Sequence, residues 1–299
     1  MTRGRFLKVG LTGVGTLVAG GATLFELVDH GVLPGKHTLD IITGACDVPQ
    51  PALDFAALGP SYSKSFYSRA RNREVGYTIA YPPGHKPGDQ LPLVVMLHGE
   101  GGDHTSGVAG LSPANAVALE VNGMPLRPMA MVTVDGGRGY WNPHPGDDPM
   151  GMVVDELIPL CQGLGLGRAP DTIGMLGISM GGYGAILFAE KFPHLVRAVA
   201  AISPAVWTSY DEAQSVNSAA YASPAAFAAA DVVTHASALA GIPVRVASGN
   251  GDPFRPGVVA LAKALPPGKV VELSAGCHSG SFFLQQTPPS LEFLSRHLA

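Results

Sequence analysis

Past its midpoint the chain reads Gly177-Ile178-Ser179-Met180-Gly181, a Gly-x-Ser-x-Gly sequence. The apolar residues before it, 172–176, predict a buried strand, and residues 182–191 predict a helix that ends at Phe192-Pro193. A serine at an abrupt turn from strand to helix is held in a strained, exposed conformation. Glycine on either side fits this turn, because a β-carbon there would collide with the strand or the helix. The stretch marks Ser179 as a candidate nucleophile, against the alternative of a glycine-rich turn without chemistry.

The rest of the chain from residue 61 alternates between strand and helix patterns. Residues 75–81 predict a strand with one buried face, which follows the turn of a hairpin at 71–73. Continuous apolar runs predict further strands at 93–97, 129–134, 198–202, 243–247 and 270–273. Helical patterns occupy 112–120, 152–161, 182–191, 258–265 and 290–298, and an Ala/Ser-rich insertion with short helices occupies 209–240. This alternation predicts an α/β fold with a mostly parallel central sheet and helices on both faces.

The amino-terminal part has a different composition from the rest. Arg3, Arg5 and Lys8 precede an uncharged run at 9–25, which is the charge order of an export signal. We therefore predict an export signal or membrane anchor at 1–27, a Pro/Gly-rich linker at 28–60 and a catalytic domain at 61–299. The domain is then exported, and is secreted, in the cell envelope, or anchored to the membrane through residues 9–25 with its catalytic part outside the cytoplasm. A cleaved signal and a retained anchor both stay open.

Composition excludes several functional classes. Only 14% of the 299 residues are charged and the net charge is −4, so no basic surface for nucleic acid is expected. The three cysteines, Cys46, Cys161 and Cys277, are too few and too widely spaced for a disulfide framework or a metal site. One pair could form in an oxidising compartment, and the sequence does not decide which. Neither a metal nor a cofactor is predicted.

A serine nucleophile needs a base and a third group that orients the base. In a parallel α/β sheet such groups collect at the carboxyl ends of the strands. Asp252 follows the predicted strand at 243–247, and His278 follows the strand at 270–273. The order Ser…Asp…His is the order of an α/β-hydrolase, so these residues are the predicted acid and base. Asp211 and Asp231 lie in the insertion and are second choices for the acid.

Acyl transfer also requires N–H donors for a tetrahedral oxyanion. We predict the Met180 N–H, directly after the serine, and the Glu100 N–H in the Gly-rich loop at 98–102. Trp141 and Asn142 lie in a loop after a predicted strand, where they could line an acceptor cleft or simply pack the loop.

Several short motifs occur together in this chain. They are His98-Gly99, the segment 177–185, Ser203-Pro204-Ala205-Val206-Trp207, Asp252-Pro253-Phe254 and His278. Together they resemble the putative esterase family of α/β-hydrolases, which groups esterase D, S-formylglutathione hydrolase and the antigen 85 mycolyltransferases. The resemblance covers about residues 66–298 and implies Ser179 as nucleophile, His278 as base, Asp252 as acid, and Glu100 and Met180 as oxyanion donors. Many members carry an aromatic residue two places after the histidine, where this chain has Gly280, with Phe282 and Phe283 beyond.

The predicted function is a serine esterase that hydrolyses an acyl ester through an acyl-serine intermediate. Its substrate would be a small-molecule or lipid acyl ester, and Phe282 joins Trp141 and Asn142 as a candidate substrate-binding residue. One alternative is an acyltransferase of the antigen 85 type, which would hand the acyl group to a sugar or lipid hydroxyl. Another is a non-catalytic secreted binding protein on the same fold. Binding alone would not require Ser179, Asp252 and His278 together.

Overall fold

The computed structural model describes residues 44–168 and 173–298, and the residues from Cys46 onward form one compact unit. The predicted export signal or anchor at 1–27 lies outside the described residues. Within the described ranges, no helix is both long enough and apolar enough to cross a membrane.

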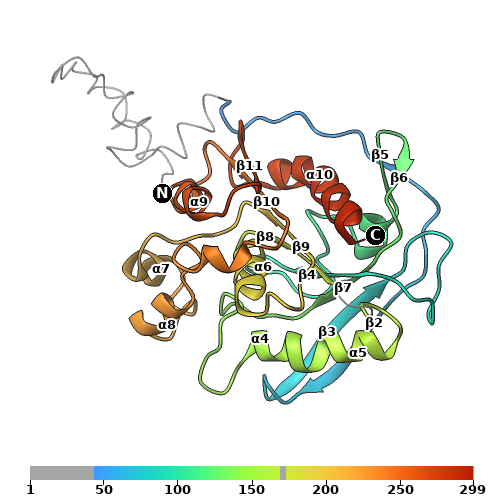
Figure 1. Ribbon diagram of the computed structural model, residues 1–299, viewed down its shortest axis with the longest axis horizontal. Coiled ribbons are helices and arrows are strands. Elements are labelled where there is room, and N and C mark those ends of the chain that lie inside the picture. The colour runs from blue at the N-terminus through green and yellow to red at the C-terminus, as the bar shows by residue number, and fades with distance from the viewer. Residues whose placement is uncertain (1–43, 169–172, 299) are drawn as a thin grey trace, which may run out of the picture. The chain divides into compact units, whose positions relative to one another are not determined.

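The core of this unit is an eight-stranded sheet (Figure 1). Its spatial order is β11-β10-β9-β8-β4-β7-β3-β2. The strands are β2 (Ser61–Ser68), β3 (Arg73–Ala80), β4 (Leu93–Leu97), β7 (Ala130–Val134), β8 (Ile173–Ile178), β9 (Ala198–Ile202), β10 (Val244–Gly249) and β11 (Val270–Ser274). From β7 to β11 all neighbours pair in parallel, whereas β3 pairs antiparallel with both β2 and β7. The predicted α/β fold with a mostly parallel sheet is confirmed.

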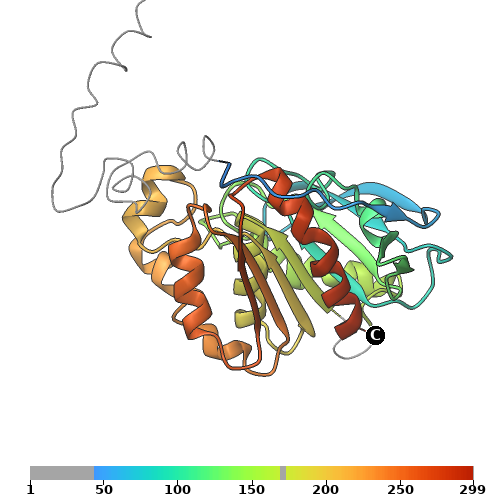
Figure 2. The same ribbon diagram turned by 90° about the horizontal axis from the view of Figure 1, so that it is seen from above.

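Helices cover both faces of the sheet (Figure 2). One face packs on a short helix, α3 (Pro113–Val117), and on the long carboxyl-terminal helix, α10 (Gly280–Leu298). The other face packs on a continuous helical segment and two further helices. These are α4 (Pro149–Gly151) with η1 (Met152–Leu157) and α5 (Ile158–Gly163), α6 (Met180–Lys191) and α9 (Arg255–Ala264). The insertion forms the short elements α7 (Tyr210–Val216), α8 (Pro224–Ala229) and η2 (Ala236–Leu239).

The helix predicted at 112–120 is shorter than expected. It ends at Val117, and the chain continues as β5 (Leu119–Val121). Asn122 and Gly123 adopt positive φ angles of 55° and 71°, and they form the turn of a hairpin with β6 (Met124–Pro125). An Asn-Gly pair favours such a hairpin turn as readily as the end of a helix.

The last helix is longer than the predicted 290–298. It begins at Gly280, ten residues before the predicted start, and runs through Pro288 and Pro289. Two hydroxyls donate to carbonyls one turn earlier beside the prolines: Thr287 Oγ1 to Phe283 O at 2.8 Å, and Ser290 Oγ to Gln286 O at 2.7 Å. These bonds satisfy carbonyl oxygens near the point where proline supplies no N–H.

Residues 46–60 of the predicted linker belong to the unit. Cys46 forms a disulfide with Cys277, and β1 (Asp54–Phe55) pairs antiparallel with β5. A Cβ on Gly59 would lie within 3 Å of Tyr81 and Pro82 backbone atoms, so the chain passes closely by the segment that follows β3. This part of the chain is therefore packed against the fold.

Candidate active site

Ser179 lies at the turn between β8 and α6, with φ 57° and ψ −120°. A non-glycine residue in this region carries strain of about 1–3 kcal/mol, and such residues cluster at active sites. Neighbouring backbone leaves no room for side chains beside it: a Cβ on Gly177 would collide with Gly181 O, and one on Gly181 would collide with Leu97 O. The Ser179 N–H donates to Ile202 O at 2.9 Å. The serine is therefore fixed on a strained turn at the amino end of a helix.

Ser179, His278 and Asp252 form one hydrogen-bonded chain. His278 Nε2 lies 2.9 Å from Ser179 Oγ, and His278 Nδ1 lies 2.9 Å from Asp252 Oδ2. The Asp252 side chain is 0% exposed and that of His278 is 19% exposed. The second oxygen of Asp252 accepts the Phe254 N–H at 2.8 Å, which fixes the carboxylate. This geometry can remove a proton from the serine hydroxyl and stabilise the resulting imidazolium.

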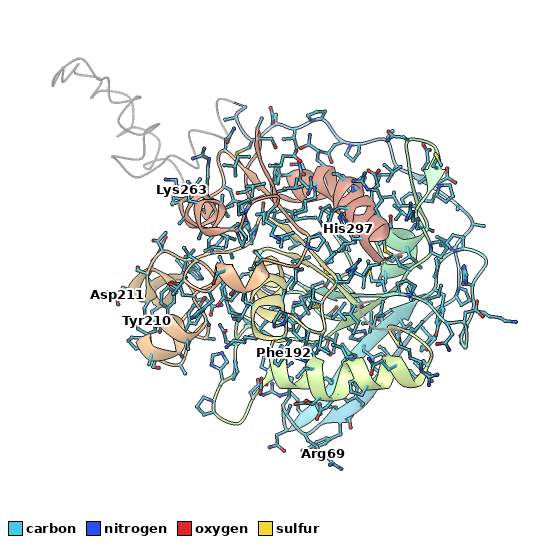
Figure 3. The ribbon with its side chains drawn as sticks, in the orientation of Figure 1. Arg69, Phe192, Tyr210, Asp211, Lys263 and His297 are labelled. Atoms are coloured by element: carbon cyan, nitrogen blue, oxygen red, sulfur yellow. A yellow bond between two sulfur atoms is a disulfide. The ribbon has the colours of Figure 1, made fainter. Side chains whose placement is uncertain are left out.

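The second-choice acids lie elsewhere. Asp211 is exposed on α7, at the periphery of the molecule (Figure 3). Asp231 accepts the Val233 N–H and the Thr234 hydroxyl within its own loop. The structure thus brings Asp252 to His278 and keeps the other two carboxylates engaged or exposed away from it.

Two phenylalanine rings flank the His278 imidazole. The Phe254 ring centroid lies 5.1 Å away and that of Phe283 lies 5.0 Å away, both in edge-to-face geometry. Phe283 therefore supplies the aromatic contact that Gly280 lacks. Phe254 also packs on Trp207, with centroids 4.7 Å apart. Sequence reasoning placed neither phenylalanine beside the base, although the start of a helix after His278 would have indicated that Phe283 returns toward it.

The loop at 98–102 lies directly beside the serine. A Cβ on Gly99 would be 3.5 Å from the Ser179 Cβ and 3.3 Å from Ile178 O. Met180 is the first residue of α6, where backbone N–H groups have no partner inside the helix. The Glu100 carboxylate accepts Arg138 Nη2 at 2.7 Å and Nε at 3.2 Å, so its side chain is paired with the next loop. The geometry is compatible with the Glu100 and Met180 N–H groups as oxyanion donors.

His98 holds this loop as a neutral imidazole. Its Nε2 accepts the Gly136 N–H at 2.9 Å, which leaves Nδ1 to donate to Gly99 O at 2.7 Å. Burial lowers the pKa of His98 by disfavouring the charged form. The Trp141 indole N–H donates to His98 O at 3.3 Å, and the two rings pack at 5.1 Å. His98 and Trp141 together brace the candidate oxyanion loop.

The three candidate substrate-binding residues are buried. Trp141 is 1% exposed, and its ring packs where side chains at Gly136 and Gly184 would otherwise lie. The Asn142 amide donates to Ala220 O at 3.3 Å in the interior. Phe282 is fully buried beneath Gly276. These residues pack the loops around the site, and the partly exposed aromatic rings beside His278 are those of Phe254 and Phe283.

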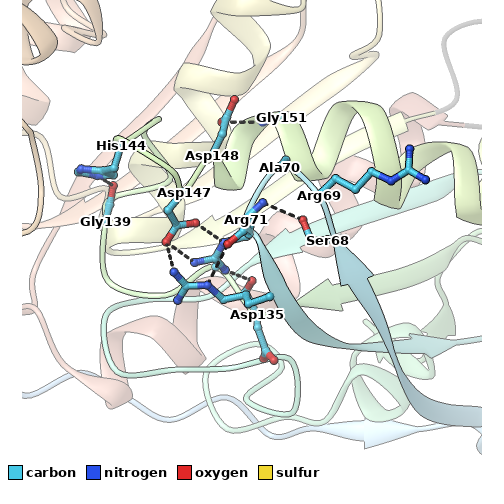
Figure 4. Close-up of polar contacts among 12 residues, drawn as sticks. Ser68, Arg69, Ala70, Arg71, Asp135, Gly139, His144, Asp147, Asp148 and Gly151 are labelled. Atoms are coloured by element: carbon cyan, nitrogen blue, oxygen red, sulfur yellow. Dashed lines mark hydrogen bonds and ion pairs between the residues drawn. The ribbon is translucent and has the colours of Figure 1, made fainter.

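The loop that follows β7 is clamped at its far end (Figure 4). Arg71 is buried and donates to both oxygens of Asp147, at 2.6 and 3.0 Å, and to Asp135 O at 2.6 Å. Arg73 adds a second guanidinium 3.0 Å from the same Asp147 carboxylate. Because this loop carries Arg138 and Trp141, the clamp fixes both supports of the loop at 98–102.

Two of the three cysteines form a disulfide bond, and the third is a free thiol. Cys46 pairs with Cys277, and Cys161 is a buried free cysteine whose pKa is raised to about 12 by desolvation. No group of three potential metal ligands occurs among the residues that the structure describes.

The fold and the serine–histidine–aspartate geometry together define the class of α/β-hydrolases. Residues 68–264 match the family described as "Putative esterase", and the chain belongs to this family, so it is an esterase-type hydrolase. No curated protein matches the sequence.

Solved structures share the fold at low sequence identity. A ferulic acid esterase has a TM-score of 0.64 at 17% identity, covering 80% of this chain and 99% of that one. The S-formylglutathione hydrolase of Agrobacterium tumefaciens has a TM-score of 0.63 at 19% identity, and the match covers 84% of this chain and 100% of that one. The fluorophosphonate-binding serine hydrolase F of Staphylococcus aureus has a TM-score of 0.62 at 15% identity, and the match covers 80% of this chain and 99% of that one. At such identities the likeness is one of fold.

Proposed function

We propose that this protein is a serine esterase that hydrolyses a carboxylic ester through an acyl-Ser179 intermediate. The observation that carries the proposal is the hydrogen-bonded chain from Ser179 through His278 to Asp252, with 2.9 Å at each step. The strained turn at Ser179 supports it, because a residue held in this conformation points its side chain toward a substrate.

In the acylation step, His278 Nε2 takes the proton of the Ser179 hydroxyl as Oγ attacks the ester carbonyl carbon. The carbonyl oxygen becomes an oxyanion that accepts the N–H groups of Met180 and Glu100, and the positive amino end of α6 adds to its stabilisation. When the tetrahedral intermediate collapses, His278 gives the proton to the departing alkoxide, and the alcohol leaves. Asp252 keeps Nδ1 protonated throughout, so that Nε2 is free to act as the base.

In the second half of the cycle, water enters where the alcohol left. His278 deprotonates this water, hydroxide attacks the acyl carbon, and the free acid leaves while Ser179 regains its proton. We propose hydrolysis over transfer to a second alcohol, because a transferase needs a dedicated acceptor cleft to compete with water. The residues considered for such a cleft, Trp141 and Asn142, are buried.

We further propose that the enzyme works outside the cytoplasm. The charge order at 1–27 favours export, and the Cys46–Cys277 bond is of the kind that persists in oxidising compartments. A reporter fused after Ala299 tests this proposal. Reporter activity confined to the cytoplasm would contradict it, and mass analysis of the mature amino terminus would distinguish cleavage from a retained anchor.

The proposed nucleophile is tested by labelling with a serine-reactive fluorophosphonate, followed by peptide mapping. We expect one equivalent of label on Ser179, and loss of turnover by about 10⁶-fold in Ser179→Ala, as in the subtilisin serine knockout. The matched control is Ser203→Ala, a change at a buried serine on the neighbouring turn. Stoichiometric label that persists in Ser179→Ala would rule out this nucleophile.

A further inference from the structure

The base of the proposed mechanism lies next to the only disulfide in the described chain. Cys277 directly precedes His278 and is bonded to Cys46, which lies 231 residues earlier; the two Cα atoms are 4.8 Å apart. His278 and Cys277 belong to the loop 275–279, which joins β11 to α10. The bond therefore fixes the peptide that carries the imidazole to a segment from the other end of the sequence.

The segment 46–50, which we call the strap, runs past this loop and the amino end of α10 (Figures 1 and 2). A Cβ on Gly276 would lie 3.0 Å from Val48 Cγ1, so the strap packs on the loop just before the base. After the base, Gln50 Nε2 donates to Ser281 O at 3.5 Å, and Gln285 Nε2 donates to Pro49 O at 3.4 Å. Both hydrogen bonds are long, so the covalent bond is the strongest link between strap and loop.

Besides the disulfide, the loop is held through the His278 side chain, which contacts Ser179 and Asp252, and through Ser279, whose carbonyl accepts the Phe283 N–H at 2.9 Å. Gly276 has φ 128°, a conformation that side-chain-bearing residues rarely adopt, and its carbonyl accepts the Gly251 N–H at 2.9 Å. The Cys277 carbonyl accepts only a local N–H, that of Ser279, among the described backbone bonds. Catalytic side chains must be held within about 0.5 Å of their productive geometry. Among the described bonds the peptide at 277–278 has no backbone hydrogen bond to a distant segment, so the disulfide is the long-range backbone restraint at this point.

From this geometry we infer that the Cys46–Cys277 disulfide is a positioning device for His278. It holds the peptide at 277–278 so that His278 Nε2 reaches Ser179 Oγ while Nδ1 keeps its hydrogen bond to Asp252 Oδ2. The inference rests on the proposed function, since it concerns the base of that mechanism. It also makes the enzyme dependent on redox conditions: the oxidised form is the active form, and opening the bond lowers turnover in a protein that stays folded.

The test compares the oxidised full-length protein with the same protein treated with dithiothreitol. Two electrons and two protons pass from the dithiol, which becomes a cyclic disulfide, to the Cys46–Cys277 bond, which becomes two thiols. Alkylation at about pH 8 then traps the reduced form. Cys161 stays unmodified because it is 0% exposed and its burial also raises the pKa of the thiol, so the number of alkylated thiols reports this bond alone. Cys161→Ala serves as the matched cysteine control, with unchanged activity and unchanged response to dithiothreitol.

The readouts are kcat and KM for a p-nitrophenyl ester, and the rate of fluorophosphonate labelling. We expect reduction, or Cys46→Ser, to lower kcat and the labelling rate by roughly 10- to 100-fold, the scale of an ångström misplacement, with KM changed by less than about twofold. Reoxidation of protein that was reduced but not alkylated should restore both. A merely structural bond would instead change the fraction of active protein and leave the kcat of the folded molecules intact.

Assays are made at a temperature where the circular dichroism of the reduced protein matches that of the oxidised protein. If reduced protein keeps its kcat and labelling rate there, the inference is overturned. It is equally overturned if no such temperature exists, because the bond then serves the whole fold. Failure of the oxidised protein to label at Ser179 at all would refute the proposed function instead, so the two failures are distinguishable.

Discussion

Asp252 Oδ2 lies 2.9 Å from His278 Nδ1, and the aspartate side chain behind this contact is fully buried. Asp252→Asn should keep the shape of the site but allow the amide N–H to face Nδ1, which favours the wrong imidazole tautomer. We expect kcat to fall by about 10⁴-fold, less than for Ser179→Ala. Steady-state kinetics on one ester, with Asp211→Asn and Asp231→Asn as controls, measures this. A larger loss in either control would assign the acid to the insertion.

The Trp141 indole N–H donates to His98 O at 3.3 Å. Trp141→Phe keeps most of the buried ring but leaves this carbonyl without the donor, which should lower the free energy of unfolding by about 1–3 kcal/mol. Because the bond braces the loop of Glu100, kcat should fall while KM changes little. Urea unfolding and ester kinetics check both effects, with the exposed Tyr67→Phe as control. Equal loss of stability without any change in kcat would assign Trp141 to packing alone.

Glu190 is 8% exposed, and desolvation with the nearby Asp231 raises its pKa to about 9. The folded state therefore keeps a proton that the unfolded chain releases above its normal pKa, near 4.3. Stability should fall as pH rises between these two values, by at most about 1.4 kcal/mol per pH unit. Glu190→Gln should remove this dependence and gain most over the wild type near pH 9. Urea unfolding across this range, with exposed Glu292→Gln as control, measures it; parallel curves for wild type and Glu190→Gln would contradict the assignment.

Arg71 is 3% exposed and pairs with Asp147, which is 26% exposed. Asp147→Asn leaves the buried guanidinium without its counter-charge, so we expect the free energy of unfolding to fall by about 3 kcal/mol. The exposed Arg296–Glu292 pair gives the matched control, since Glu292→Gln should cost less than about 1 kcal/mol. Thermal unfolding of both variants measures the difference. An equal loss of free energy of unfolding in the two variants would mean that the Arg71–Asp147 pair stabilises the fold no more than an exposed ion pair does.

Hydrolysis and transfer differ in which hydroxyl attacks acyl-Ser179. With Trp141 and Asn142 buried, we expect free acid to remain the main product when sugars or glycerol are present at millimolar concentration, because water at roughly 55 M outcompetes a poorly bound acceptor. Quantifying free acid and new ester by mass spectrometry gives the partition. New ester as the dominant product would identify a transferase.

Most of the central sheet could be predicted from apolar runs, because a strand that is buried on both faces consists almost entirely of apolar residues. The strands β4 and β9 have the expected bounds at 93–97 and 198–202. Two helices differ from the predicted bounds: the one predicted at 112–120 ends at Val117 before a hairpin, and the one predicted at 290–298 begins at Gly280. At both places the local sequence is compatible with more than one structure, and tertiary packing decides between them. The positions of Ser179, Asp252 and His278 at strand ends followed from the topology of parallel sheets.

The surroundings of these residues could not be predicted in the same way. Whether Phe282 or Phe283 faces His278 depends on where α10 begins, which the sequence left at Ser290. The sequence left open whether Trp141 lines a cleft or packs its loop, and the glycines at 136 and 184 provide the space into which its ring folds. The burial of Trp141 depends on glycines in two segments that are distant in the sequence, and no local sequence pattern connects the two. The pairing of Cys46 with Cys277 likewise depends on a contact across 231 residues.

That separation has a consequence for how the molecule is made. Cys277 follows Cys46 by 231 residues, so the bond beside His278 can close only after the chain through residue 277 is present. Until then Cys46 has one possible intramolecular partner, Cys161, and burial of that thiol on α5 withdraws it as the helix packs. Formation of the bond is thereby tied to the presence of residues through 277, and a product truncated after residue 276 could neither close the bond nor carry His278.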